Sequence, residues 1–404
     1  MSETAYLPAA RTGTAPAAAA HAFDPVLIFL AGVLMTLGVV MVYSASVTLE
    51  PKSFDWRDWW NSPLRQAIFA GVGFLGILVA AHVDYRVLAW PRRASGWRAG
   101  LLVLLAAGLL VAVQLPGVGR EVLGARRAIV VPALGFGFQP SEIAKVVIVI
   151  WLAALLTRPT GPQTAGAAPR GSLRHFTTGF IPAVLSCGVL IGLTVLEDFG
   201  TAALMAAVLL VLLFVARARW THLGMLGALA VLAGVATIII KPHRIERIKT
   251  FLAAAPDPLG AGYQINQALL AIGSGGWFGC GLGAGIQKYG YLPQDNNDFI
   301  LAIICEELGV AGGMVVVLLF VGFVLRGWRI AARAPDRFGQ LLALGLTMTI
   351  GLQAAMNIGV VTNSIPTKGI SLPFVSAGGS GVVVLGLATG LLASIGRSHA
   401  PANR

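Results

Sequence analysis

The chain has 404 residues, of which 56% are hydrophobic and 11% are charged, and its mean hydropathy is +0.80. A soluble domain carries roughly 25% charged residues, so this chain has too few charges to cover a water-exposed surface. The composition excludes an ordinary soluble protein, and the net charge of +12 is not gathered into a basic domain that could read a nucleic acid.

Apolar stretches follow one another along the chain, and about ten of them are long enough to cross the ~30 Å hydrocarbon core of a bilayer. In chain order, we expect spans at 25–46, 65–82, 98–116, 141–157, 176–196, 200–216, 221–240, 299–325, 338–361 and 380–396. The sequence therefore predicts an all-α integral membrane protein of about ten transmembrane helices, with a large extracytoplasmic loop at 241–298 between the seventh and eighth. Residues 1–24 are predicted to be a disordered cytoplasmic tail, 25–396 one polytopic membrane domain, and 397–404 a second cytoplasmic tail.

The arginine and lysine residues predict the orientation, because membrane proteins keep them on the cytoplasmic side. They place both termini in the cytoplasm and the 241–298 loop outside. Two outer segments, 120–127 and 241–249, are basic against this rule. Either these segments bind an anionic ligand or they tolerate the charge, and the charge pattern alone leaves both interpretations open.

Charged residues inside membrane spans are costly and mark candidate functional sites. Glu142 and Lys145 are three residues apart at the start of the fourth span, so a helix places them on one face, where they can pair. The pair is either functional or a structural ion pair. Asp298 opens the eighth span at the water boundary, and Glu306 and Glu307 lie deeper, where they must face a polar interior.

The outer segment after the seventh span carries Arg244 and Arg247, which a helix would point the same way. That arrangement suits a pyrophosphate clamp, and it equally suits basic side chains that reach lipid headgroups. The glycine-rich run at 273–285 has no Gly-Lys pair, so Walker-type ATP binding is excluded. No histidine or cysteine spacing predicts a zinc site, and the three cysteines are expected to be small buried hydrophobes.

Six segments resemble, in order, the signature regions of the SEDS (shape, elongation, division and sporulation) family. They are MVYSAS (41–46), GARRAIVVPALGFGFQPSEIAK (124–145), EDFGTA (197–202), RIERIKTFL (244–252), the long segment 262–313, and NIGVVTNSIPTKGISLPFVSAGGSG (357–381). The PTKG and YLP motifs resemble the division (FtsW) branch of the family more than the elongation (RodA) branch.

The resemblance implies a peptidoglycan glycosyltransferase of the bacterial inner membrane that acts in cell division. It would polymerise lipid II, a disaccharide-pentapeptide carried on undecaprenyl pyrophosphate, at the outer face of that membrane. The implied partners are a class B penicillin-binding transpeptidase and other membrane proteins of the division machinery. The alternatives are a role in elongation, a flippase for the lipid-linked precursor, and a non-catalytic scaffold for division.

Carried over position by position, the catalytic aspartate of the family is Asp298, as general base or as the group that orients the acceptor hydroxyl. The implied substrate-binding residues are Arg65, Glu142, Lys145, Arg244, Arg247, Lys368 and Ser376. The basic residues would offset the charge of the leaving pyrophosphate, and Glu142 would orient Lys145. The sequence leaves open whether a divalent cation, magnesium or manganese, bridges Asp298 and the pyrophosphate.

The chain departs from the family pattern at three places near these motifs. Ala128 stands where the family usually has tryptophan, and Ala377 where it usually has tyrosine. Asn296 and Asn297 replace a His-Thr pair just before Asp298. These departures bear on acceptor binding and on the partner surface.

Overall fold

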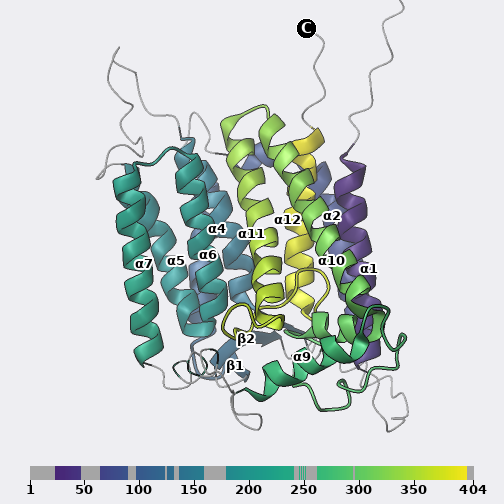
Figure 1. The fold of residues 1–404 in the computed structure, drawn as a ribbon. Coiled ribbons are helices and arrows are strands. Elements are labelled where there is room, and N and C mark those ends of the chain that lie inside the picture. Colours follow the sequence, from purple (N-terminus) through teal and green to yellow (C-terminus); the bar gives the residue numbers. More distant parts are fainter. Residues whose placement is uncertain are drawn as a thin grey trace, which may run out of the picture.

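The computed structural model describes residues 23–46, 64–89, 97–122, 125–131, 136–158, 179–240, 262–293 and 296–397, together with 245, 247, 249 and 251. Within these residues, the chain forms a bundle of long helices with a small sheet and a short helix across one end (Figure 1). The last helix of the bundle ends at the opposite end (Figure 1).

Each of the predicted spans is a helix in the structure. In chain order they are α1 (Pro25–Ala45), α2 (Leu64–His82), α3 (Trp97–Ala112), α4 (Pro140–Leu156), α5 (Ile181–Glu197), α6 (Phe199–Val215), α7 (Trp220–Ile240), α10 (Ile300–Arg333), α11 (Arg337–Val361) and α12 (Gly379–Arg397). A further helix, α9 (Tyr263–Gly275), lies in the predicted outer loop. Among the described helices, six are long and apolar enough to cross a membrane by length and composition alone, so the predicted helical membrane fold is confirmed.

Aspartate side chains start three of these helices. The carboxylates of Asp24, Asp198 and Asp336 accept hydrogen bonds from backbone N–H groups in the first turns of α1, α6 and α11, at 3.2, 2.8 and 2.7 Å. Such capping satisfies N–H groups that have no partner within the helix. Asp24 also pairs with Arg326 of α10 at 2.6 Å, so the residue predicted to end the tail is part of the bundle.

Small residues let α2 and α12 pack closely against each other. Gly386 and Gly390 form a Gly-x-x-x-Gly pattern on α12, and a Cβ at either position would collide with the backbone of α2 at Gly73 or Ile77. Membrane helices gain packing energy from such close approach, because lipid offers no hydrophobic driving force between them. The pattern therefore fixes α2, whose first turn borders the site, against α12.

A three-stranded antiparallel sheet, which the sequence did not predict, covers one end of the bundle. Its strands are β1 (Gly119–Val122), β2 (Ala125–Val131) and β3 (Phe136–Phe138), in that order across the sheet. Ile129 is the register partner of Gly119 on one side and of Phe138 on the other. The sheet carries the basic outer segment 120–127 to the start of α4.

Helix α10 is interrupted at Gly309, which has a positive φ of 75°. The carbonyls of Glu306 and Glu307 accept hydrogen bonds from backbone N–H groups of segment 276–281, at 3.0 Å each. The two N–H groups that follow Gly309 donate to carbonyls of the same segment, at 2.9 and 3.2 Å. Segment 276–281 thus supplies backbone partners that the broken helix lacks.

Gly309→Ala is expected to destabilise the protein by about 1–3 kcal/mol, because alanine is strained at this φ and its Cβ would collide with the Trp277 carbonyl. The measurement is thermal unfolding in detergent. Gly322→Ala, also in α10, is the matched control, since its Cβ would meet only the Leu30 side chain at 3.5 Å. Equal unfolding temperatures for the two variants would contradict the prediction.

Candidate active site

A cavity of about 220 Å³ lies at the end of the bundle that carries the sheet. It is bounded by the first turns of α2 and α4, by β2, by the start of α6, and by two segments, 297–298 and 369–381. The charged residues of its lining are Arg65, Arg127, Glu142, Asp198 and Asp298. Segments far apart in the sequence therefore bring three carboxylates and two guanidinium groups around one cavity.

Asp298 lies just before α10 and is partly buried in the cavity wall. The side-chain amide of Asn357 donates to the backbone carbonyl of Asp298 at 2.8 Å and to that of Ile370 at 2.7 Å. One amide on α11 thus holds the aspartate backbone against the segment that enters α12.

The environment of Asp298 favours its protonated form. Burial, and after it the negative charge of Asp198, raise the pKa of Asp298 to about 7, while the charges of Arg127 and Arg247 oppose the rise. A general base works best when its pKa lies near the working pH. The structure therefore places at this cavity a carboxylate that can take up a proton near neutrality.

Basic residues reach the cavity from two elements. Arg65 on α2 lies with its guanidinium 5.8 Å from the centre of the Phe69 ring. Arg127 on β2 has a buried Nε with no hydrogen-bond partner among the described residues. A buried donor without a partner is costly, so Arg127 is suited to an anionic ligand. Arg247 is exposed, and its charge acts on Asp298.

The predicted Glu142–Lys145 ion pair is present at the base of the cavity. The Lys145 Nζ lies 2.8 Å from Glu142 Oε2 and donates to Gln353 Oε1 at 2.6 Å. Gln353 in turn donates to the Ser371 carbonyl at 2.9 Å. Glu142 and Gln353 line the cavity, whereas the buried Lys145 ammonium is directed to these two side chains. Lys145 therefore holds the Glu142 and Gln353 side chains in place in the cavity wall.

Ser376 connects two parts of the cavity wall. Its hydroxyl donates to the Asn297 carbonyl at 2.6 Å and accepts from the Leu372 N–H at 2.7 Å. Ala377 N–H donates to the Asn296 carbonyl at 2.9 Å. Ser376 therefore positions the residues beside Asp298, and its contact with substrate stays a prediction.

Lys368 also lies at this end of the bundle. Its Nζ is 5.1 Å from the centre of the Phe199 ring. Burial lowers the pKa of Lys368, and the charge of Asp198 opposes that shift. Of the other predicted basic residues, Arg244 lies outside the described residues.

The acids deeper in α10 find their partners away from this cavity, and only Glu306 Oε2 is buried without one among the described residues. Glu307 accepts from Ser44 Oγ at 2.7 Å and pairs with Lys288 Nζ at 2.9 Å, and both side chains of the pair are fully buried. Glu306 accepts from two backbone N–H groups at 286–287, at 2.8 and 3.2 Å. The predicted polar surroundings of both acids are confirmed. Cys280 is exposed, so the expectation that all three cysteines are buried is wrong for this one, which lies in an outer turn.

Four site residues were not singled out from the sequence, and one of them, Arg127, lay within the basic segment 120–127. Asp198 lies in the EDFGTA segment as the cap of α6, where it accepts from the Thr201 hydroxyl at 2.7 Å. Gln353 and Asn357 are neutral amides in α11, which has no charged residue after Arg337. Polar side chains in a membrane span are themselves a functional signal, and that signal could have found both amides.

Comparison with known proteins places most of the chain in one family. The family model described as "Cell cycle protein", covering FtsW, RodA and SpoVE, matches residues 25–400. A probable peptidoglycan glycosyltransferase FtsW from Geobacter sp. (strain M18) is 40% identical over 375 residues, covering 92% of this chain and 96% of the relative. Stage V sporulation protein E of Bacillus subtilis (strain 168) is 39% identical over 375 residues, covering 93% and 97%.

Solved structures resemble the fold over the same length. A chain from work on the structural coordination of polymerization and crosslinking by a peptidoglycan synthase complex aligns with a TM-score of 0.70 and 27% identity, covering 94% of this chain and 98% of that one. The rod shape determining protein RodA of Thermus thermophilus aligns with a TM-score of 0.62 and 25% identity, with the same coverage.

Proposed function

Because the chain belongs to the FtsW/RodA/SpoVE family of cell cycle proteins and is a multi-span membrane peptidoglycan glycosyltransferase, we propose that it polymerises lipid II with Asp298 as its general base. The names of the relatives favour a division role over elongation, and the polymerase over the flippase and scaffold alternatives. The observation that carries the proposal is the cavity in which Asp298, with a pKa of about 7, lies beside Arg65 and Arg127.

The reaction joins two sugars and releases a lipid pyrophosphate. Asp298 takes the proton from the C4 hydroxyl of the acceptor sugar as that oxygen bonds to the anomeric carbon of the donor. The bond from that carbon to the pyrophosphate oxygen breaks, and its electron pair leaves with the pyrophosphate. Arg65 and Arg127 bind the departing anion, with Arg247 nearby, because fixed cations stabilise charge that develops in the transition state.

The remaining predicted residues keep this arrangement in place. Glu142 and Lys145 hold Gln353, which holds the segment at Ser371. Ser376 ties the same segment to the backbone before Asp298. These residues position the cavity wall and take no part in the bond changes of the reaction.

A divalent cation fits the donor set at the cavity. Magnesium is commonly held by one or two carboxylates together with phosphate oxygens of the substrate. Asp298 and Asp198 are the carboxylates that would hold it, and when bound it would offset negative charge on the pyrophosphate. Among the described residues, no group of three or more acids, histidines and cysteines forms a dedicated metal cage.

The proposed setting is the outer face of the bacterial inner membrane, with both termini in the cytoplasm and the sheet end outside. The positive charge of the predicted cytoplasmic loops supports this orientation. A class B penicillin-binding transpeptidase is the proposed partner, with other division proteins around it. The likeness to a chain of a peptidoglycan synthase complex supports that partner.

The experiment that tests the function is polymerisation of lipid II by the purified protein in detergent, with and without a class B transpeptidase. Glycan strands separated by gel electrophoresis are the expected product. A folded protein, alone and in the complex, that makes no strands would refute the proposal.

The rate of polymerisation is expected to rise with pH through about 7, because only the ionised carboxylate of Asp298 can accept the proton. Asp198→Asn removes a negative charge that raises the pKa of Asp298, so the acidic limb should move to lower pH. Asparagine keeps the capping role at α6. Initial rates measured from pH 5.5 to pH 8.5, roughly the range in which a group of this pKa titrates, check both statements. If the acidic limb of the pH–rate profile stayed in place in Asp198→Asn, the predicted effect of Asp198 on the pKa of Asp298 would be wrong.

A further inference from the structure

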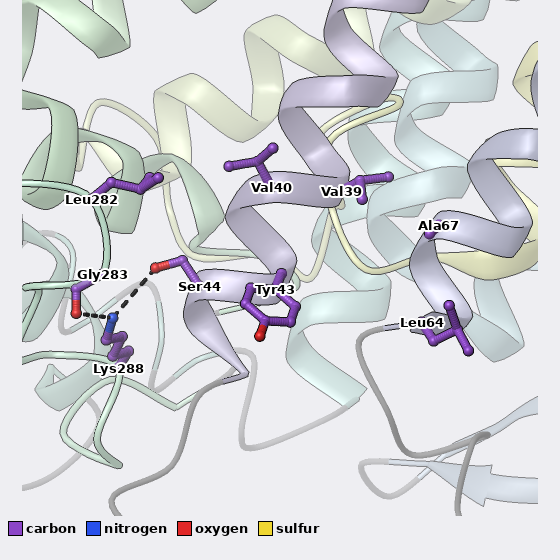
Figure 2. Close-up of a pocket in the computed structure, with 9 residues that line it drawn as sticks. All are labelled: Val39, Val40, Tyr43, Ser44, Leu64, Ala67, Leu282, Gly283 and Lys288. Atoms are coloured by element: carbon purple, nitrogen blue, oxygen red, sulfur yellow. Dashed lines mark hydrogen bonds between the residues drawn. The ribbon is translucent and has the colours of Figure 1, made fainter. Parts of the chain in front are cut away.

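A second, larger cavity of about 550 Å³ lies between the outer ends of α1 and α2, next to the turn that follows α9. Figure 2 shows its walls: Val39, Val40 and Tyr43 on α1, Leu64 and Ala67 on α2, and Leu282 and Gly283 in the turn. The volume is typical of cavities that bury small ligands, about 300–1,000 Å³. We propose that this groove binds the polyprenyl chain of the lipid-linked substrate, an inference that rests on the proposed function.

The floor of the groove offers no free charge to a ligand. Lys288 is the charged residue of the lining, and an ammonium has three donors. Its Nζ donates to Glu307 Oε1 at 2.9 Å, to the Gly283 carbonyl at 2.7 Å and to Ser44 Oγ at 3.3 Å, the last two of which are drawn in Figure 2. With all three donors satisfied, the lysine has none left for a phosphate. The groove therefore favours a hydrocarbon chain over a charged ligand.

The first turn of α2 connects this groove to the catalytic cavity. Leu64 and Ala67 are three residues apart on one face and line the groove, whereas Arg65 between them lines the catalytic cavity. One turn of helix rises only ~5.4 Å. A lipid whose pyrophosphate lies at Arg65 can therefore pass its hydrocarbon chain over this turn into the groove.

The mouth of the groove suits a chain that enters from lipid. Tyr43 is 61% exposed and Leu64 is 49% exposed. Tyrosine is favoured where an apolar surface meets a polar interface, because its ring is apolar and its hydroxyl is polar. The groove thus has an amphipathic rim at the sheet end of the bundle and apolar walls below it.

Two substitutions fill the groove from opposite walls, Val40→Trp on α1 and Ala67→Trp on α2. Each is expected to lower the polymerisation rate about tenfold with lipid II on a long polyprenyl chain, and to leave the rate unchanged with a short-chain analogue. Val72→Trp is the control, because Val72 is an exposed residue of α2 outside the groove lining. Equal rates for all three variants on the long-chain substrate would overturn the inference.

Photocrosslinking tests the same site without catalysis. A benzophenone amino acid at position 40 is expected to label radioactive long-chain lipid II several-fold more than the same probe at position 72. Equal labelling at the two positions would overturn the proposal that the groove binds the lipid. Labelling of the protein's own chain in place of the lipid would also overturn it. Lipid labelling at position 40, together with a wild-type protein that makes no strands, would refute the polymerase and keep the binding site.

Discussion

Asp298→Ala is expected to reduce the rate of lipid II polymerisation by about 10²–10⁴-fold, the usual contribution of a general base. The substitution removes the carboxylate that the cavity holds at a pKa of about 7, and it leaves the backbone carbonyl of residue 298 bonded to Asn357. Asp298→Asn should lose a similar factor, because an amide keeps the shape but cannot take the proton. Strand length and initial rate in detergent are the measurements.

The control for this result is a carboxylate far from the cavity. Asp84 is exposed at the opposite end of the bundle, where its side chain caps the short helix η2 (Tyr85–Leu88). Asp84→Ala should polymerise at the wild-type rate. If Asp298→Ala and Asp298→Asn also did so, while unfolding at the wild-type temperature, the assignment of the base would be wrong.

Glu307→Gln is expected to destabilise the protein by about 3–5 kcal/mol, the typical cost of removing one partner of a buried ion pair. The pair of Glu307 and Lys288 is fully enclosed, so the lysine ammonium would stay in the interior without its counter-charge. Unfolding in detergent with increasing denaturant measures the loss.

Two further variants separate charge from shape. Glu306→Gln is the neighbouring control, because Glu306 accepts from backbone N–H groups at 286–287, which carry no net charge. Glu306→Gln should lose less stability against unfolding than Glu307→Gln. Combining Glu307→Gln with Lys288→Met removes both charges and should recover most of the stability, since apolar replacement of a buried pair is often neutral. A double variant as unstable as Glu307→Gln would contradict the explanation.

The helices were predictable from the sequence because a bilayer imposes a length and a polarity on each span. The short sheet was not, since β2 reads as ARRAIVV and carries two arginines within a segment that resembled an outer loop. Its pairing with β1 and β3 is decided by neighbours along the chain and by the helix ends beneath them. Its last four residues, AIVV, are apolar, but a run this short does not distinguish a strand from a helix segment.

The site residues that could be predicted are charged residues in otherwise apolar parts of the sequence. Asp298, Glu142 and Lys145 stand out as charges at or inside apolar helices. Arg127 belonged to a basic segment with two open interpretations, and only its placement beside Asp298 favours the anionic ligand. The Lys145 ammonium donates a hydrogen bond to Gln353, which lies on another helix. The spacing of residues along the sequence could not reveal this contact.

The exchange of backbone hydrogen bonds at Gly309 has a mechanical consequence. Segment 276–281 and α10 are joined by backbone bonds that run in both directions across the break. A force on segment 276–281 would load these bonds together and pass into the first part of α10. Asp298 lies two residues before that part begins. Tension applied to segment 276–281 therefore has a short path to the Asp298 carboxylate.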